Sequence, residues 1–326
     1  MFLISLMFGT LIAISATSWF SMWMGLEINL LSLIPLMSKN KFIFPAEAAM
    51  KYFLTQTMAS IMFLFSIITS LNMMNLLLNS NLIIMMLLNS ALLIKMGAAP
   101  FHFWFPEIME GLNWNNCILL LTWQKIAPMI MLMQNMKFLT FLSLIIISSS
   151  IVSSILSLNQ ISLRKMISYS SINHIGWMLA TMLTSQLNWL FYFMIYSLIS
   201  LNLILIFKKF NMFFLKQLMN SINQNKMNKF ILMLNFLSLG GLPPFIGFLP
   251  KWFTIYFLVK NNFIILTMIL IIFTLIMLFM YLRITFNSLS ISYAETMTSA
   301  TNLNYLIITF NFLFLTSLTM NPFILT

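Results

Sequence analysis

Long apolar runs follow one another along almost the whole chain, and they constrain its fold more than any other feature. Hydrophobic residues make up 61% of the 326 residues and charged residues only 6%, whereas a soluble domain carries about 25% charged residues. A helix needs roughly 20 apolar residues to cross a bilayer, and runs of that length recur from end to end. The sequence therefore predicts an all-α, polytopic membrane protein with no soluble domain.

About eleven membrane spans are predicted, all within one transmembrane domain that covers residues 1–326. Their approximate ranges are 2–20, 22–38, 46–71, 81–107, 113–133, 138–157, 165–184, 188–207, 230–258, 262–287 and 304–322. The N-terminal segment has neither a basic region nor a small-residue cleavage site, so Met1 is expected to begin the first span. The polar stretch 288–303 is assigned no role.

Basic residues gather in alternate loops. Counted from the N-terminus, even loops and their flanks hold eleven of them and odd loops only two. The even set is Lys39, Lys41, Lys51, Arg164, Lys165, Lys208, Lys209, Lys216, Lys226, Lys229 and Arg283, and the odd set is Lys137 and Lys260. Positive loops usually stay on the side of synthesis, so the N-terminus is predicted on that side and the C-terminus opposite. The net charge of +11 is too scattered to indicate nucleic-acid binding.

Three lysines fall outside that pattern, because Lys95, Lys125 and Lys251 each lie near the middle of an apolar run. A charge at that depth costs at least ~3 kcal/mol and usually marks an ion or proton pathway. The alternative is that each long side chain reaches the membrane surface. Glu27, in WMGLEINLLSLIP, is the natural partner for such a lysine because a buried carboxylate needs one. The alternative for Glu27 is a helix end facing lipid head groups.

A lysine in this setting suits proton relay. Burial disfavours the charged form of the amine, whereas a nearby carboxylate favours it, so a modest electrostatic change can switch the group. If Glu27 moves or gains a proton, Lys95 can pass its own proton on. Lys125 and Lys251 would then extend the pathway through ordered water.

Two spans are interrupted by glycine and proline. The first interruption lies in LLIKMGAAPFHFWFPE, residues 92–107, and the second in LSLGGLPPFIGFLPKW, residues 237–252. Non-helical backbone at membrane depth is tolerated only inside protein or beside water. The breaks fall in the fourth and ninth spans, which predicts two inverted five-helix repeats, about 1–133 and 138–287, followed by a C-terminal helix at about 304–322.

The remaining polar residues of the spans offer weaker signals. His174 lies in SYSSINHIGWM, where Ser170 and Ser171 are candidates for holding water, and His102 lies in the first break. Each histidine is equally explained as a structural residue, and a haem or metal held by the two remains an alternative. The single cysteine, Cys117, excludes an internal disulfide and an iron–sulfur cluster. No nucleotide-binding motif supplies energy, so transport must be driven by another gradient or by a larger machine.

Several motifs together resemble one known family. WMGLEINLLSLIPLM, EAAMKYFLTQTMAS, KMGAAPFHFWFPE, LLLTWQKIAPM, LNQISLRKMISYSSINHIGWM and FLSLGGLPPFIGFLPKW are similar to NADH dehydrogenase subunit 2, the mitochondrially encoded antiporter-like subunit of respiratory complex I. The resemblance covers essentially the whole chain, and the methionine-rich, valine-poor composition looks insect-like. Bacterial relatives have fourteen spans, whereas this chain resembles the animal form that lacks the first three.

The resemblance implies a proton-translocating subunit of the membrane arm of NADH:ubiquinone oxidoreductase, driven by quinone reduction elsewhere in the complex. By motif, Glu27 and Lys95 match the family's pair, Lys125 its central site and Lys251 a further site in the second broken helix. It also implies no redox cofactor in this chain, since FMN, iron–sulfur clusters and ubiquinone belong to the complex as a whole.

Its implied partners are the other membrane-arm subunits, including neighbouring antiporter-like subunits, and phospholipids. Its implied location is the mitochondrial inner membrane, with the N-terminus on the matrix side and the C-terminus on the intermembrane-space side. Two rival functions remain open: a stand-alone cation/proton antiporter of the same fold, and a structural scaffold whose lysines bind only lipid or neighbouring helices.

Overall fold

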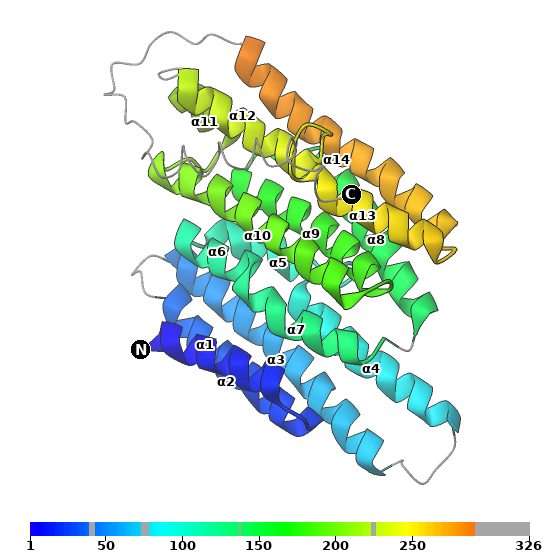
Figure 1. The fold of residues 1–326 in the computed structure, drawn as a ribbon. Coiled ribbons are helices and arrows are strands. Elements are labelled where there is room, and N and C mark those ends of the chain that lie inside the picture. The colour runs from blue at the N-terminus through cyan, green and yellow to red at the C-terminus, as the bar shows by residue number, and fades with distance from the viewer. Residues whose placement is uncertain (39–42, 73–77, 137, 223–225, 291–326) are drawn as a thin grey trace. The chain divides into compact units, whose positions relative to one another are not determined.

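A computed structural model describes residues 1–38, 43–72, 78–136, 138–222 and 226–290, and all its named elements are helices (Figure 1). Contacts divide the chain into two compact units, Met1–Ile145 and Ile146–Thr326. Whether the predicted repeats 1–133 and 138–287 are inverted copies of each other stays a prediction.

The first unit contains seven complete helices and the start of an eighth. They are α1 (Phe2–Ser15), α2 (Trp19–Met37), α3 (Ile43–Asn72), α4 (Leu78–Met96), α5 (Trp104–Gly111), α6 (Trp114–Leu121), α7 (Trp123–Gln134) and α8 (Leu139–Ser157). The second unit continues α8 and adds α9 (Leu163–Met182), α10 (Gln186–Lys209), α11 (Leu215–Ile222), α12 (Lys226–Gly240), α13 (Phe248–Lys260) and α14 (Ile264–Ser290).

Six helical segments among the described residues are long and apolar enough to cross a membrane. They are Trp19–Met37, Ile43–Leu71, Trp114–Gln134, Leu139–Ser157, Gln186–Lys209 and Ile264–Asn287. Three shorter apolar helices, Phe2–Ser15, Ile83–Met96 and Lys229–Gly240, accompany them. These segments support the predicted all-α, multi-pass fold, while the count of eleven spans stays a prediction. The span predicted at 304–322 and most of the stretch 288–303 lie outside the described residues.

Helices α1 and α2 form a tight antiparallel pair (Figure 1), and small residues make this possible. A Cβ atom on Gly25 would lie 2.6 Å from the backbone nitrogen of Ala13, and one on Gly9 would lie 3.0 Å from that of Asn29. Small residues of this kind let membrane helices approach backbone to backbone. The first span ends at Ser15 instead of the predicted residue 20, because the Ser18 side chain accepts the Ser21 amide and starts α2.

Both predicted helix breaks are present. Helix α4 ends at Met96 and α5 begins at Trp104, with Gly97 at φ +74° between them. Helix α12 ends at Gly240 and α13 begins at Phe248, with Gly241 at φ +76°. The positive φ explains why a glycine directly follows the end of each helix, because L-residues with a side chain rarely adopt this conformation.

A third break was not predicted, and it interrupts the span expected at 113–133. Thr122 lies between α6 and α7 with φ −113° and ψ −71°, and its carbonyl accepts the Lys125 amide at 3.3 Å. Pro128 weakens this helix because it has no amide hydrogen to donate to the carbonyl of Gln124. The irregular turn therefore lies directly beside one of the three intramembrane lysines.

Candidate functional site

Lys95 lies one residue before the end of α4 and is buried, with only 8% of the residue exposed. Its side chain lines a small cavity of about 10 Å³ in the first unit, which is about the room that a single water molecule needs. Lys95 is thus enclosed by protein, while the alternative that its side chain reaches the membrane surface stays open. The break that follows Met96 leaves this lysine at the end of a half-helix.

Glu27 lies in the middle of α2, which contradicts the alternative that it occupies a helix end. Its Oε1 atom is buried and accepts no hydrogen bond from any described residue. The carboxylate acts electrostatically on Lys95, yet the described residues contain no ion pair between the two. A polar pair separated in this way is commonly bridged by water.

Three side-chain amides line the same cavity, two of them buried, and sequence reasoning missed them. Gln124 donates from Nε2 to the Oδ1 atom of Asn29 at 2.8 Å, which ties α7 to α2. Gln56 on α3 is only 3% exposed, and its Nε2 atom has no hydrogen-bond partner among the described residues. All three side chains line the cavity together with Lys95. An unpaired buried donor at a cavity wall is a natural water ligand.

Lys125 is the most deeply buried of the three lysines, at 1% exposure. Its Nζ atom lies 5.5 Å from the centre of the Phe105 ring, which belongs to α5 just after the first break. A Cβ on Gly97 would lie 3.2 Å from Phe105, so the break also packs against this ring. Lys125, Lys95 and the first break therefore share one neighbourhood in the first unit.

Lys251 lies at the start of α13 in the second unit, 8% exposed. Its Nζ atom donates to the carbonyl of Gly240 at 2.8 Å, which is the end of α12. The same atom lies 5.9 Å from the Trp177 ring centre. A Cβ on Gly241 would lie 2.9 Å from the lysine Cδ, so glycine leaves the room that this side chain occupies. The lysine thus holds the two halves of the second broken helix together.

His174 lies near that second break. Its Nδ1 atom is 2.9 Å from the Tyr192 hydroxyl, and its ring packs against Tyr196. A cavity of about 10 Å³ is lined by His174, both tyrosines, Gly247 and Pro250, which directly precedes Lys251.

The two serines predicted beside His174 are engaged with their own helix. Ser170 donates to the Ile167 carbonyl and Ser171 to the Ser168 carbonyl, each at 2.7 Å. Each hydroxyl also contacts a tyrosine, Tyr281 for Ser170 and Tyr196 for Ser171. Their predicted role in holding water stays a prediction.

His102 lies within the first break, apart from the residues that line the Lys95 cavity. Its Nδ1 atom is 3.2 Å from the Pro100 carbonyl, and its ring stacks on Phe103. Its Nε2 atom is buried without a hydrogen-bond partner among the described residues. Those residues contain no group of three or more histidine, cysteine, aspartate or glutamate side chains that could hold a metal ion.

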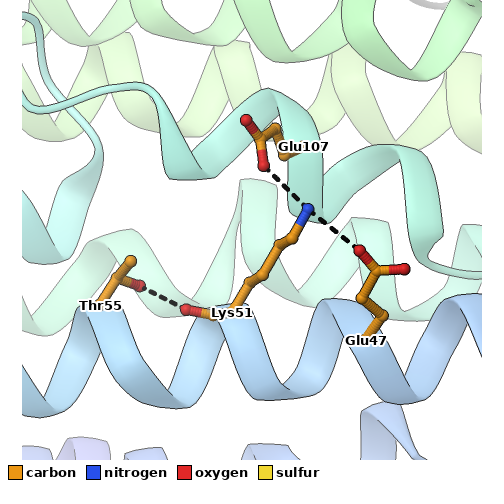
Figure 2. Close-up of polar contacts among 4 residues, drawn as sticks. All are labelled: Glu47, Lys51, Thr55 and Glu107. Carbon is orange, nitrogen blue, oxygen red and sulfur yellow. Dashed lines mark hydrogen bonds and ion pairs between the residues drawn. The ribbon is translucent and has the colours of Figure 1, made fainter.

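An ion cluster in the first unit was also missed (Figure 2). The Nζ atom of Lys51 lies 3.0 Å from Glu107 Oε2 and 3.3 Å from Glu47 Oε1. Lys51 was counted among the charges of the even loops and their flanks, and it lies inside α3 and pairs with Glu107 of α5. Trp104, on the same α5, donates to the Ile94 carbonyl beside Lys95. The cluster therefore ties the second half of the first broken helix to α3.

Comparison with known proteins identifies relatives of this chain. Residues 16–278 match the family described as NADH:quinone oxidoreductase/Mrp antiporter, transmembrane. NADH-ubiquinone oxidoreductase chain 2 of Aedes aegypti is 52% identical over 96% of this chain and 93% of its own length. The chain 2 of Anopheles gambiae is 46% identical over 80% of this chain and 77% of its own.

Solved structures share the fold at lower identity. A chain of respiratory complex I from Thermus thermophilus with bound aureothin superposes with a TM-score of 0.87, at 21% identity, over 98% of this chain and 77% of that one. A chain of the Mrp complex from Dietzia gives a TM-score of 0.78 at 14% identity, over 92% of this chain and 62% of that one. These likenesses establish an antiporter-like fold.

Proposed function

This chain belongs to the NADH-ubiquinone oxidoreductase chain 2 family, and from that membership we propose that it moves protons through its four intramembrane ionisable residues. It is a multi-pass membrane subunit of NADH:ubiquinone oxidoreductase, respiratory complex I. The proposed relay consists of Glu27, Lys95 and Lys125 in the first unit and Lys251 in the second. Quinone reduction elsewhere in the complex is proposed to drive it.

One observation carries the proposal most directly: Lys95 and the Oε1 atom of Glu27 are buried, the two residues interact electrostatically, and they form no direct ion pair. A close ion pair would hold both charges in place. Charges that are held apart can instead gain or lose a proton when either group changes state, and Lys95 lines a cavity of water size. Asn29, Gln56 and Gln124 are proposed to hold the bridging water.

The other two lysines have surroundings that suit proton release and capture. The Lys125 ammonium lies 5.5 Å from the centre of the Phe105 ring, which belongs to the helix that follows the first break. Lys251 donates to the carbonyl that ends α12, so its proton state is tied to the geometry of the second break. We propose that changes at the breaks alter the protonation of both lysines. His174, His102, Ser170 and Ser171 are proposed only as accessory water-holding groups.

The location and partners proposed for the chain follow those of its relatives. We propose the mitochondrial inner membrane, with the N-terminus in the matrix and the C-terminus in the intermembrane space, and contacts with the neighbouring antiporter-like subunits. We also propose that the chain holds no redox centre, so that the electron carriers of the complex lie in other subunits. Transport of one charge against 100 mV costs ~2.3 kcal/mol, which the complex would have to supply.

The test is the number of protons translocated per NADH oxidised by the assembled complex in proteoliposomes. Lys95→Met, Lys125→Met and Lys251→Met are each expected to lower that ratio. Lys260→Gln changes an exposed lysine at the end of α13 and is the matched control. Normal ratios in all three variants, in complexes assembled to normal levels, would contradict the proposal.

The two rival functions give different results. A stand-alone antiporter predicts cation/proton exchange by the isolated chain in liposomes, which the proposed function does not. A scaffold predicts that Lys125→Met lowers the amount of assembled complex while each assembled complex still pumps normally. The buried position of Lys125 favours the relay, because a scaffold has no need of a charge at 1% exposure.

A further inference from the structure

A groove at one end of the second unit has no place in the proton relay. Its volume is about 570 Å³, within the usual range for small-molecule sites. The loop between α8 and α9, the start of α11 and the last turns of α14 form its walls. Two cations, Lys216 and Arg283, lie on these walls, and apolar side chains such as Met280 and Ile284 complete them.

The walls of the groove are held in a fixed arrangement. The Leu163 amide donates to the Phe213 carbonyl at 2.9 Å, and the Leu215 amide donates to the Ile161 carbonyl at 3.2 Å. These bonds join the loop after α8 to the start of α11. Arg283 donates to the Leu158 carbonyl at 3.4 Å, and a guanidinium has five N–H donors, so one such bond leaves others available to a ligand.

Among the described residues of this unit, no carboxylate lies near those cations. Between Glu110 and Glu295 the sequence contains no acidic residue, so residues 146–290 hold ten lysines and arginines and no aspartate or glutamate. Isolated positive charges at a membrane surface are attracted to anionic lipid head groups by about 1 kcal/mol each. The part of this unit that the structure describes therefore supplies no counterion to the groove, whose two cations make it complementary to an anion.

The position of Arg283 along α14 indicates membrane depth. Exposed apolar residues recur along this helix every three or four positions, at Met268, Ile272, Leu275, Phe279 and Phe286, and exposed Arg283 falls in the same series. It lies nineteen residues beyond Ile264, which is about 29 Å along a helix and close to the hydrocarbon thickness of roughly 30 Å. A lipid-facing helix that starts at one surface thus places this guanidinium at the opposite head-group level.

We propose that this groove binds an anionic phospholipid. The phosphodiester accepts hydrogen bonds from Arg283 and from the Lys216 ammonium, since arginine matches phosphate geometry in a bidentate manner. The amide side chains of Asn159 and Gln160 offer further donors to the head group, and an acyl chain lies along Ile161 and Leu215. A zwitterionic lipid lacks the net negative charge that the two cations attract, and inorganic phosphate lacks the acyl chain.

The experiment uses the whole complex and a photoactivatable phosphatidylglycerol, with cross-linked peptides mapped by mass spectrometry. Labelling is expected at residues 158–161, 215–218 or 280–287. Unlabelled phosphatidylglycerol should compete for it, whereas phosphatidylcholine and inorganic phosphate should not. The double variant Arg283→Gln with Lys216→Gln should lose at least about tenfold of the labelling, as expected for two lost charge contacts, and Lys260→Gln should retain it.

Three outcomes would overturn the proposal. They are equal labelling by a phosphatidylcholine probe, unchanged labelling in the double variant, and labelling blocked because a neighbouring subunit covers the groove. If Arg283→Gln lowers the amount of assembled complex, Lys216→Gln alone still tests the site, because this exposed side chain makes no hydrogen bond to another described residue. Proton translocation is measured in parallel on the same complexes. The translocation result tests the relay, and the labelling result tests the lipid site independently of it.

Discussion

The carboxylate of Glu27 acts electrostatically on the ammonium of Lys95, which lines a water-sized cavity, and the two groups form no ion pair. In the proposed relay, the proton state of one residue controls that of the other. Two unit charges just beyond ion-pair distance attract by about 3–4 kcal/mol at an effective dielectric constant of about 20. That range is large enough to switch a protonation equilibrium by more than tenfold.

Glu27→Gln removes this attraction and retains the shape of the side chain. The protons translocated per NADH should fall, because Lys95 would no longer be held in its charged form. Glu27→Asp should retain part of the activity, since the charge remains. Glu110→Gln removes a carboxylate from α5 that does not line the cavity and should leave the ratio unchanged. An unaltered ratio in the Glu27→Gln complex would remove the pair from the mechanism.

Gln56→Leu tests whether the cavity holds functional water. The Gln56 Nε2 atom makes no hydrogen bond to another described residue, so its removal should change folding stability by no more than about 1 kcal/mol. Assembly should therefore be normal, while proton translocation slows because a water ligand is lost. Gln56→Glu should also lower the rate of translocation, because it adds a second charge beside Lys95. Translocation at the wild-type rate in Gln56→Leu would mean that the amide only fills space.

The charged residues and the glycine–proline clusters were readable from the sequence because each is costly in a bilayer and therefore stands out. The breaks at Gly97 and Gly241 and the burial of Lys95 and Lys251 follow from that cost. The polar wall of the cavity could not be found in this way. Asn29, Gln56 and Gln124 come from three helices, and no spacing along the chain links them.

The ion cluster escaped sequence reasoning for a related reason. Lys51 follows Lys39 and Lys41 closely, so it was counted with the charges of a loop. Its partner Glu107 lies fifty-six positions away, beyond any helical repeat. Only the packing of α3 against α5 brings the two together. The break at Thr122 was also missed, because a lone threonine carries no signal of a helix end.

Gly241→Ala tests the link between the second break and Lys251. Alanine at φ +76° is strained by about 1–2 kcal/mol, and its Cβ would lie 2.9 Å from the lysine Cδ. The lysine should lose its bond to the Gly240 carbonyl, and translocation should fall. Gly240→Ala is a matched control from the neighbouring position, where the nearest atom to a new Cβ, in the Tyr281 ring, lies at 3.4 Å. Equal effects of the two substitutions on translocation would contradict a specific role for this contact.

The last prediction concerns the ion cluster of Lys51, Glu47 and Glu107 (Figure 2). Lys51→Glu places three carboxylates together and should loosen α5 from α3, lowering the thermal stability of the complex, more at low salt than at high salt. The double exchange Lys51→Glu with Glu107→Lys restores opposite charges across the two helices and should recover most of the loss. Because these groups are largely exposed, the change in stability should be small. The number of protons translocated per NADH should nevertheless fall clearly in Lys51→Glu, because Trp104 links α5 to the Ile94 carbonyl beside Lys95. If the exchange fails to rescue translocation, or if Lys51→Glu leaves it unaltered, α5 does not transmit the state of the cluster to Lys95.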